Sequence, residues 1–219
     1  MRLSALKTFL PGILMVLVST SIMASSENHI EPSGVNINDT AALQRGAGLF
    51  VNYCLSCHSA SYMRYSRLAQ DLDLSEEVVM ENLVFSDAKI GDTMEIAMQA
   101  EDAERWFSNA PPDLSLVGRS RGPDWLYAYL RSFYEDESGK WNNHVLPNVA
   151  MPHVLWQVQE NLSPEEYDNT VRDLVTFLDY LGEPAKLKRK NIGVWVILFL
   201  AVFAFLTYLL KAEYWRDVH

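Results

Sequence analysis

Two long segments of this 219-residue chain place apolar residues at helical spacing. The first begins near Asn38 and Asp39, residue types that favour a helix N-terminus. Its apolar positions recur about once per turn, at Leu43, Ala47, Phe50 and Cys54. The pattern predicts a helix, and because Gly46 and Gly48 lower its helix propensity, we expect another helix to pack closely there.

The second periodic segment opens with Ser163, Pro164 and Glu166, which predict an N-cap, a first-turn proline and a capping box. Gly182 and Pro184 predict where this helix ends. One of its faces is apolar, at Tyr167, Val171, Leu174, Val175 and Leu178. The segment therefore predicts a second amphipathic helix with one face against a core.

The stretch between these two helices is broken by proline and glycine. Shorter helical patterns cover residues 76–84 and 124–133, and no strand pattern is strong enough to predict a sheet. About 160 residues without an internal repeat or a low-complexity linker fit one domain. We therefore expect one all-α domain over residues 25–185.

The N-terminal end has the pattern of a secretory signal peptide. Arg2 and Lys7 precede a short apolar run at 13–18, and Ala24 is a small residue suited to cleavage. An uncleaved anchor helix is the alternative, but Pro11 interrupts the run and leaves it too short to span a membrane. We predict a signal peptide at residues 1–24 that is removed by cleavage.

The C-terminal end has an uninterrupted apolar run instead. Residues 192–210 contain no charge and would form a helix of about 28 Å at 1.5 Å per residue. Trp195, Tyr208 and Trp215 suit the two interfaces of a membrane. A buried core helix would need a larger domain around it than this chain supplies, so we predict a transmembrane helix.

The charges around this helix raise the question of its orientation. A basic linker, 186–191, precedes the span and carries more positive residues than the tail, 211–219. A count of positive charges alone would put the large domain inside the cell, but long domains follow their signal peptide largely regardless of loop charge. We predict a single-pass membrane protein, with its domain outside the cytoplasm and its tail in the cytoplasm.

The exported domain is strongly acidic. Residues 25–185 hold 26 Asp and Glu against 10 Lys and Arg, a net charge of −16 compared with −10 for the whole chain. Each acidic cluster taken alone, at 71–77, 101–104 or 135–137, reads as a solvated surface. Their sum attracts cationic partners at long range and argues against nucleic acid or anionic lipid as the ligand.

The most informative motif is Cys-Leu-Ser-Cys-His at residues 54–58, which holds the only two cysteines of the chain. This spacing is typical of covalent haem attachment, with Cys54 and Cys57 bonded to the porphyrin and His58 beneath the iron. A redox or structural disulfide is the alternative. A thioredoxin-like disulfide site lies between a strand and a helix, and the sequence around residues 54–57 does not show that pattern. We predict a small c-type cytochrome domain wrapped around one covalent haem.

A low-spin haem needs a second axial ligand. Met151 lies between Ala150 and Pro152, in a loop that Pro152 stiffens, whereas Met63, Met80, Met94 and Met98 lie in helical or polar stretches. Met151 could instead fill a gap in the core, as methionine often does. His144 and His153 are rival ligands, and either would lower the reduction potential relative to His/Met ligation.

Several segments, taken in order, resemble the cytochrome c1 family in its bacterial form. They are residues 54–68, Pro-Pro-Asp-Leu-Ser-Leu at 111–116 with Arg-Ser-Arg at 119–121, Ala-Met-Pro at 150–152, residues 173–184, and the C-terminal stretch 208–219. The similarity runs from about residue 38 to the C-terminus. Two features differ: the loop at 146–149 lacks the family's glycines, and His153 stands where a proline is expected.

The resemblance implies roles for individual residues. Cys54 and Cys57 would hold the haem, and His58 and Met151 would ligate its iron. Arg121 would pair with a haem propionate, a role that Arg119 could take instead. The residues expected to shape the haem pocket are Pro111, Pro112 and Asn109.

The resemblance also implies a one-electron relay in the cytochrome bc1 complex, the respiratory ubiquinol:cytochrome c oxidoreductase. The chain would form a dimeric complex with cytochrome b and a Rieske iron-sulfur protein, and would pass electrons from the Rieske protein to a basic cytochrome c. It would carry electrons without making bonds. The alternatives are a free-standing membrane-anchored cytochrome c that serves a terminal oxidase or reductase, and a haem-based ligand sensor.

Overall fold

The computed structural model describes residues 30–218, so the predicted signal peptide, 1–24, lies outside the described part of the chain. The helices are α2 (Thr40–Tyr53), α3 (Tyr65–Asp71), α4 (Glu76–Asn82), α5 (Ala100–Phe107), α6 (Val117–Ser120), α7 (Pro123–Arg131), α8 (Trp156–Asn161), α9 (Pro164–Gly182) and α10 (Lys186–Tyr214), with a 3-10 turn η1 at Arg216–Val218. The strands are β1 (Ala60–Arg64), β2 (Thr93–Met94), β3 (Phe133–Glu135) and β4 (Trp141–Asn143). The predicted all-α class is confirmed, since the described residues are mostly helical and the strands are few and short.

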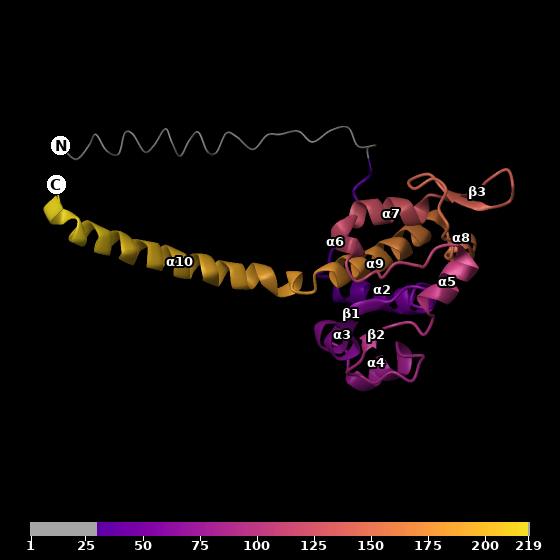
Figure 1. Ribbon diagram of the computed structural model, residues 1–219, viewed down its shortest axis with the longest axis horizontal. Helices are drawn as coiled ribbons and strands as arrows, with labels where there is room; N and C mark the ends of the chain where they lie inside the picture. Colours follow the sequence, from indigo (N-terminus) through magenta and orange to yellow (C-terminus); the bar gives the residue numbers. More distant parts are fainter. Residues whose placement is uncertain (1–29, 219) are drawn as a thin grey trace. The chain divides into compact units, whose positions relative to one another are not determined.

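Both helices predicted from periodicity are present and form the centre of the core. The Asp39 side chain caps α2 by accepting a hydrogen bond from the Ala42 N–H at 3.0 Å. Ser163 and Glu166 form the predicted capping box of α9. The predicted apolar faces of both helices are buried, and the helices lie side by side in Figure 1.

The close approach predicted at Gly46 is confirmed, but the same prediction for Gly48 is wrong. A Cβ atom on Gly46 would lie 2.2 Å from the Asp173 carbonyl oxygen of α9, whereas one on Gly48 would meet nothing within 4 Å. Arg45, beside Gly46, pairs with the Asp173 carboxylate at 2.6 Å. Only the side of α2 that carries Gly46 faces α9, since two residues of helix turn Gly48 away.

α6 and α7 also pack against α9 (Figure 1). A Cβ on Gly118 of α6 would lie 2.3 Å from the Leu178 carbonyl oxygen, so this contact too needs a glycine. At the end of α9, a Cβ on Gly182 would lie 2.9 Å from the Arg119 backbone nitrogen. The arginine-containing segment after the Pro-Pro pair is therefore held against the C-terminal half of α9.

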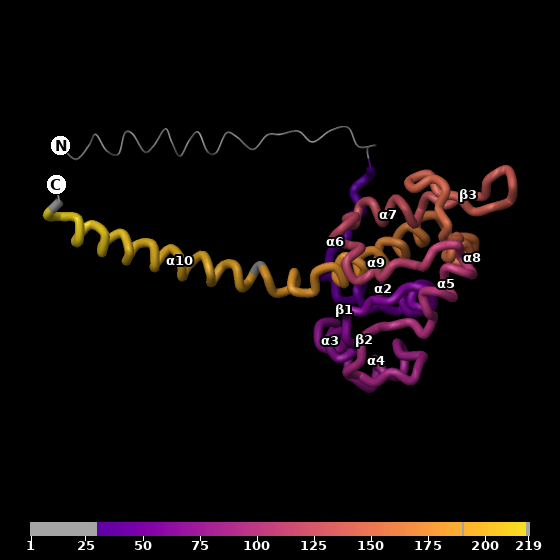
Figure 2. The backbone as a smooth tube through the Cα atoms, in the orientation of Figure 1, coloured from indigo at the N-terminus to yellow at the C-terminus, as the bar shows by residue number. Residues whose placement is uncertain are grey.

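Two small antiparallel sheets, which the sequence analysis did not predict, interrupt the helices. β1 pairs with β2, and β3 pairs with β4 in a hairpin whose loop can be followed in Figure 2. The helix predicted over 124–133 ends at Arg131, because the Ser132 hydroxyl donates back to the Ala128 carbonyl and Phe133 pairs with Asn143 across the hairpin. Likewise, the helix predicted over 76–84 ends at Asn82.

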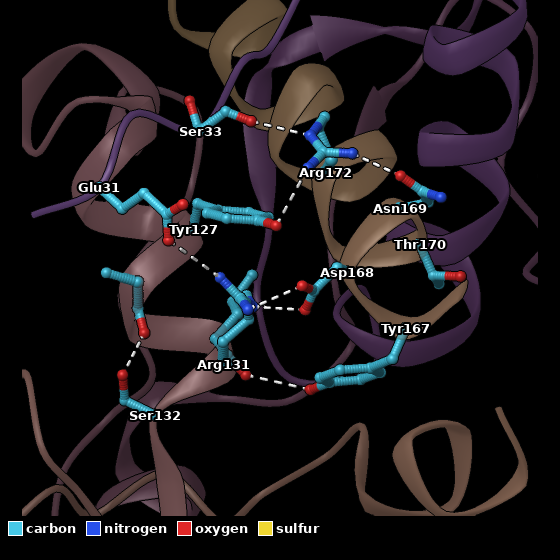
Figure 3. A network of polar contacts seen from close by, with 12 residues as sticks. Glu31, Ser33, Tyr127, Arg131, Ser132, Tyr167, Asp168, Asn169, Thr170 and Arg172 are labelled. Carbon is cyan, nitrogen blue, oxygen red and sulfur yellow. Dashed lines mark hydrogen bonds and ion pairs between the residues drawn. The ribbon is translucent and has the colours of Figure 1, made fainter. Parts of the chain in front are cut away.

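The first described residues are held by polar contacts from α7 and α9, shown in Figure 3. Arg172 Nε donates to the Ser33 carbonyl oxygen at 2.8 Å. Arg131 pairs with Asp168 at 2.7 Å and approaches Glu31 at 4.0 Å. These contacts join residues up to 139 positions apart and bind the segment before α2 to the last helices of the domain.

One described helix, α10, is long and apolar enough to cross a membrane. Its candidate span is Asn191–Tyr214, longer than the predicted 192–210. The residues predicted as a basic linker are already helical and form its first turns. There Lys186 Nζ pairs with Asp179 Oδ2 at 2.7 Å, and Arg189 pairs with Glu183.

Candidate haem-binding site

The Cys-Leu-Ser-Cys-His motif forms a tight turn at the end of α2. The Cys54 N–H donates to the Phe50 carbonyl at 2.8 Å, and the N–H groups of Cys57 and His58 donate to the Cys54 carbonyl at 3.0 and 2.9 Å. Both thiols are free. Cys54 is buried in the core, and this burial raises the pKa of its thiol to about 12. An uncharged thioether suits this apolar position better than a thiolate would.

The imidazole of His58 is oriented by the backbone of the Pro-Pro segment. His58 Nδ1 lies 2.7 Å from the Pro112 carbonyl oxygen. A carbonyl can only accept, so Nδ1 carries the proton and Nε2 keeps its lone pair for a metal. Burial lowers the pKa of His58, although the bond to Pro112 and the charge of Asp113 oppose the shift. The ring is therefore neutral at pH 7, as a metal ligand must be.

Asp113 fixes this Pro-Pro segment beside the haem motif. Its carboxylate accepts from the Ser61 N–H at 3.0 Å, the Ser61 hydroxyl at 2.7 Å and the Ser115 N–H at 2.7 Å. Burial alone would raise the pKa of Asp113, but the hydrogen bonds from Ser115 and Ser61 outweigh it and hold the pKa below its usual value. This role was not predicted from the sequence, although an Asp side chain often accepts from the backbone N–H two residues further on, as Asp113 does from Ser115.

Replacing Asp113 by asparagine is expected to destabilise the domain most at neutral pH. The folded-state pKa of Asp113 is depressed, so its stabilisation is fully present above the unfolded value of about 3.9 and is lost as pH falls through the folded value. The difference in unfolding free energy between wild type and D113N should therefore shrink below pH about 4. Urea titrations of the detergent-solubilised protein at pH 7 and pH 3 measure it. Equal differences at both pH values would contradict the assignment.

Met151 is half-buried, and its sulfur faces α7. Tyr129 Oη lies 3.4 Å from Met151 Sδ and donates to it. The two rival ligands are placed differently. His144 is exposed and stacks on Tyr134 at 4.2 Å between ring centres. His153 is buried, and its Nε2 lies 2.6 Å from Gln159 Oε1, so that nitrogen is already engaged.

The loop that carries Met151 is organised by Asn143, a fully buried residue that the sequence analysis did not single out. Its side-chain amide donates to the Tyr129 carbonyl at 2.8 Å, and its oxygen accepts from the N–H groups of Val145 and Leu146 at 2.9 and 3.1 Å. Asn148 has a φ of 62°, a conformation that asparagine tolerates better than most residues. Asparagines thus support the conformation of this loop, in which the resemblance led us to expect glycines.

The two arginines proposed for a propionate have different surroundings. Arg119 Nη1 pairs with Glu183 Oε2 at 3.1 Å. The guanidinium of Arg121 lies over the Trp125 ring, 4.9 Å from its centre, and within residues 30–218 no carboxylate is at ion-pair distance from it. Compared with Arg119, which already pairs with Glu183, Arg121 is the better candidate to pair with a haem propionate.

The remaining predicted pocket residues lie between α5 and α6. Pro112 supplies the carbonyl that orients His58, and Pro111 beside it is half-buried. Asn109 is exposed, and no hydrogen bond within the described chain joins its side chain to the others. Two free thiols and the neutral imidazole of His58 in one turn, with the thioether sulfur of Met151 on a separate loop, are the residue types that hold a c-type haem.

The sequence was compared with protein families and with known proteins, and several are similar to it. A model of the Cytochrome C1 family matches residues 33–218. A cytochrome c1 from Allochromatium vinosum is 45% identical over 249 residues, with both chains covered in full. A protein of Nitrosomonas europaea named ammonia monooxygenase gamma subunit is 44% identical over 228 residues, covering 94% of this chain and 97% of that one. A cytochrome c1 from Rhodospirillum rubrum is 27% identical over 226 residues, covering 82% and 83%.

Proposed function

This chain belongs to the cytochrome c1 family, and on that premise we propose that it is the haem-carrying electron-transfer subunit of a bacterial cytochrome bc1 complex. The observation that carries the proposal is the 2.7 Å contact from His58 Nδ1 to the Pro112 carbonyl. It leaves Nε2 available for a metal on the residue that follows Cys57, and both thiols of the motif are free. A disulfide between Cys54 and Cys57 would not require the His58 imidazole to be held in this orientation.

The chain's own residues would bind and orient the haem, which supplies a one-electron redox centre when bound. Cys54 and Cys57 would form the two thioethers, and the Pro112 carbonyl would keep the His58 ring in one orientation. Met151 would provide the second axial ligand from its asparagine-supported loop. His/Met ligation favours a fairly high reduction potential, which suits an acceptor of electrons from quinol oxidation.

The partners that we propose follow from this role. A Rieske iron-sulfur protein would deliver the electron and a basic cytochrome c would take it away, with cytochrome b as the membrane partner in a dimeric complex. The net charge of −16 on residues 25–185 supports a cationic acceptor, because it raises encounter rates with positive proteins. The chain would be a subunit of the oxidoreductase and would itself make no bonds.

The placement in the cell that we propose follows from the two chain ends. After cleavage of residues 1–24, the domain at 25–185 would remain periplasmic, since haem is attached to such motifs outside the cytoplasm. Residues 186–191 would form a basic segment at the membrane surface, and the apolar part of α10 would anchor the protein. Residues 211–219 would face the cytoplasm.

Purification of the full-length chain from its native membrane in a mild detergent tests this proposal. An affinity tag at the C-terminus is expected to bring down a multi-span cytochrome b and a Rieske protein, with quinol:cytochrome c reductase activity. Recovery of the chain alone would instead support the free-standing cytochrome. Recovery with monooxygenase subunits would overturn the proposal in favour of the role for which the Nitrosomonas relative is named.

A further inference from the structure

The hydroxyl of Tyr129 donates a hydrogen bond to the sulfur of Met151 at 3.4 Å, a contact that haem attachment does not require. A thioether sulfur has two lone pairs, so one can bind a metal while the other accepts this hydrogen bond. Tyr129 is 8% exposed, and few water molecules can compete for its hydroxyl. The contact therefore acts on the one atom of Met151 that would meet the iron.

The ring of Tyr129 is held in place by its neighbours. Trp125, one helical turn earlier on α7, stacks on it with ring centres 5.0 Å apart and planes 9° from parallel. Phe133 meets it edge-on at 5.2 Å. Asn143 holds the Tyr129 carbonyl at 2.8 Å and also fixes the start of the loop that leads to Met151. Donor and acceptor are thus positioned by one connected group of contacts.

The electronic consequence follows from the direction of the hydrogen bond. A donor at the sulfur draws electron density away from it and makes it a poorer donor to iron. Ferric iron, which carries the higher charge, loses more stabilisation from a weaker donor than ferrous iron does. Hydrogen bonding at an axial ligand is one of the means by which a protein adjusts a haem potential.

We propose that Tyr129 is a positioning residue that raises the reduction potential of the haem through its hydrogen bond to Met151. The inference rests on the proposed ligation of the iron by Met151. At a given potential, the reduced haem should be more populated with the Tyr129 hydroxyl than without it.

The chain offers a matched control in Tyr180. Its hydroxyl is also buried and faces a methionine sulfur, Met63 Sδ at 3.9 Å, while donating to Asp71 Oδ2 at 3.1 Å. Met63 is 2% exposed in the core and is not proposed to meet the iron. Tyr180→Phe therefore removes a comparable hydroxyl from a comparable place without touching the proposed ligand.

The experiment compares Tyr129→Phe and Tyr180→Phe in the full-length protein within its detergent-solubilised complex. Optical redox titration measures the ratio of reduced to oxidised haem at a fixed potential. For Y129F this ratio is expected to fall roughly fivefold, the equivalent of one ordinary hydrogen bond, or about 40 mV at 59 mV per tenfold. Imidazole should also bind the oxidised variant several-fold more weakly, since it must displace a stronger iron–sulfur bond. Y180F should change neither value.

The possible results distinguish ligation of the iron by Met151 from the effect of Tyr129 on the potential. Absence of the sulfur-to-iron absorption band in the oxidised wild type would overturn Met151 ligation itself. A normal band with an unchanged ratio in Y129F, or with tighter imidazole binding, would overturn the role of Tyr129 and leave the ligand in place. If Y129F fails to fold, site-specific 3-fluorotyrosine at position 129 keeps the ring and strengthens the donor. The ratio should then rise, and a fall would count against the proposal.

Discussion

Replacing Met151 by leucine is expected to abolish the sulfur-to-iron absorption band and to lower the reduction potential by on the order of 100 mV. Leucine has a similar volume, so the half-buried site should keep its packing while losing its only donor atom. The reduced variant should bind carbon monoxide rapidly, because the sixth position is then open. Optical spectra, redox titration and carbon monoxide mixing measure these three changes.

Met80 supplies the control for this substitution. It is a half-buried methionine of α4, and Met80→Leu should leave band, potential and carbon monoxide binding unchanged. A band that survived in M151L would show that another methionine is the ligand. A wild-type spectrum of the bis-histidine type would direct attention to His144 and His153 instead, of which His144 has the more accessible ring.

Replacing Gly46 by alanine is expected to destabilise the domain by about 3 kcal/mol or more, the upper range for an overpacked site. The added Cβ would lie 2.2 Å from the Asp173 carbonyl oxygen and 2.8 Å from Phe177 Cβ, so α2 and α9 would have to separate. A domain of this size has a total stability of only about 5–15 kcal/mol. Denaturant titrations of the haem-loaded protein, and its yield in membranes, measure the loss.

Gly48 is the matched control, two residues along the same helix. A Cβ there meets nothing within 4 Å, so Gly48→Ala should be neutral or should stabilise the protein by up to about 1 kcal/mol through helix propensity. Equal losses in G46A and G48A would show that flexibility of α2, and not its contact with α9, is what the glycines provide.

The features predicted correctly from the sequence are those that depend on residues close together in the chain. The capping box at Ser163 and the helical repeat before Cys54 involve neighbours three or four positions apart. Whether Gly46 or Gly48 faces α9 depends on the rotation of one helix against another, which the residue type alone does not encode. The glycine pattern therefore predicted the close contact but assigned it to one residue too many.

The parts of the site that could not be predicted are contacts between distant segments. His58 and Pro112 are 54 positions apart, and the hydrogen bond between them emerges only when the chain after β2 returns to the haem motif. Asn143 reads in the sequence as an ordinary loop residue, yet it is fully buried, because its polar atoms replace backbone partners for α7 and the loop before Met151. The residue types for haem binding were visible, but the groups that orient them were not.

The binding of residues 31–33 by α7 and α9 has a consequence for the order in which the domain forms. The contacts of Ser33 with Arg172, and of Arg45 with Asp173, join the first described residues and α2 to α9. Contacts of such long sequence separation form late, because the intervening chain must first be closed into a loop. With export from the N-terminus onward, as we propose, α2 would have no partner for its apolar face until α9 had crossed the membrane. The cysteine motif at its end should therefore stay open to haem delivery until the last helix of the domain arrives.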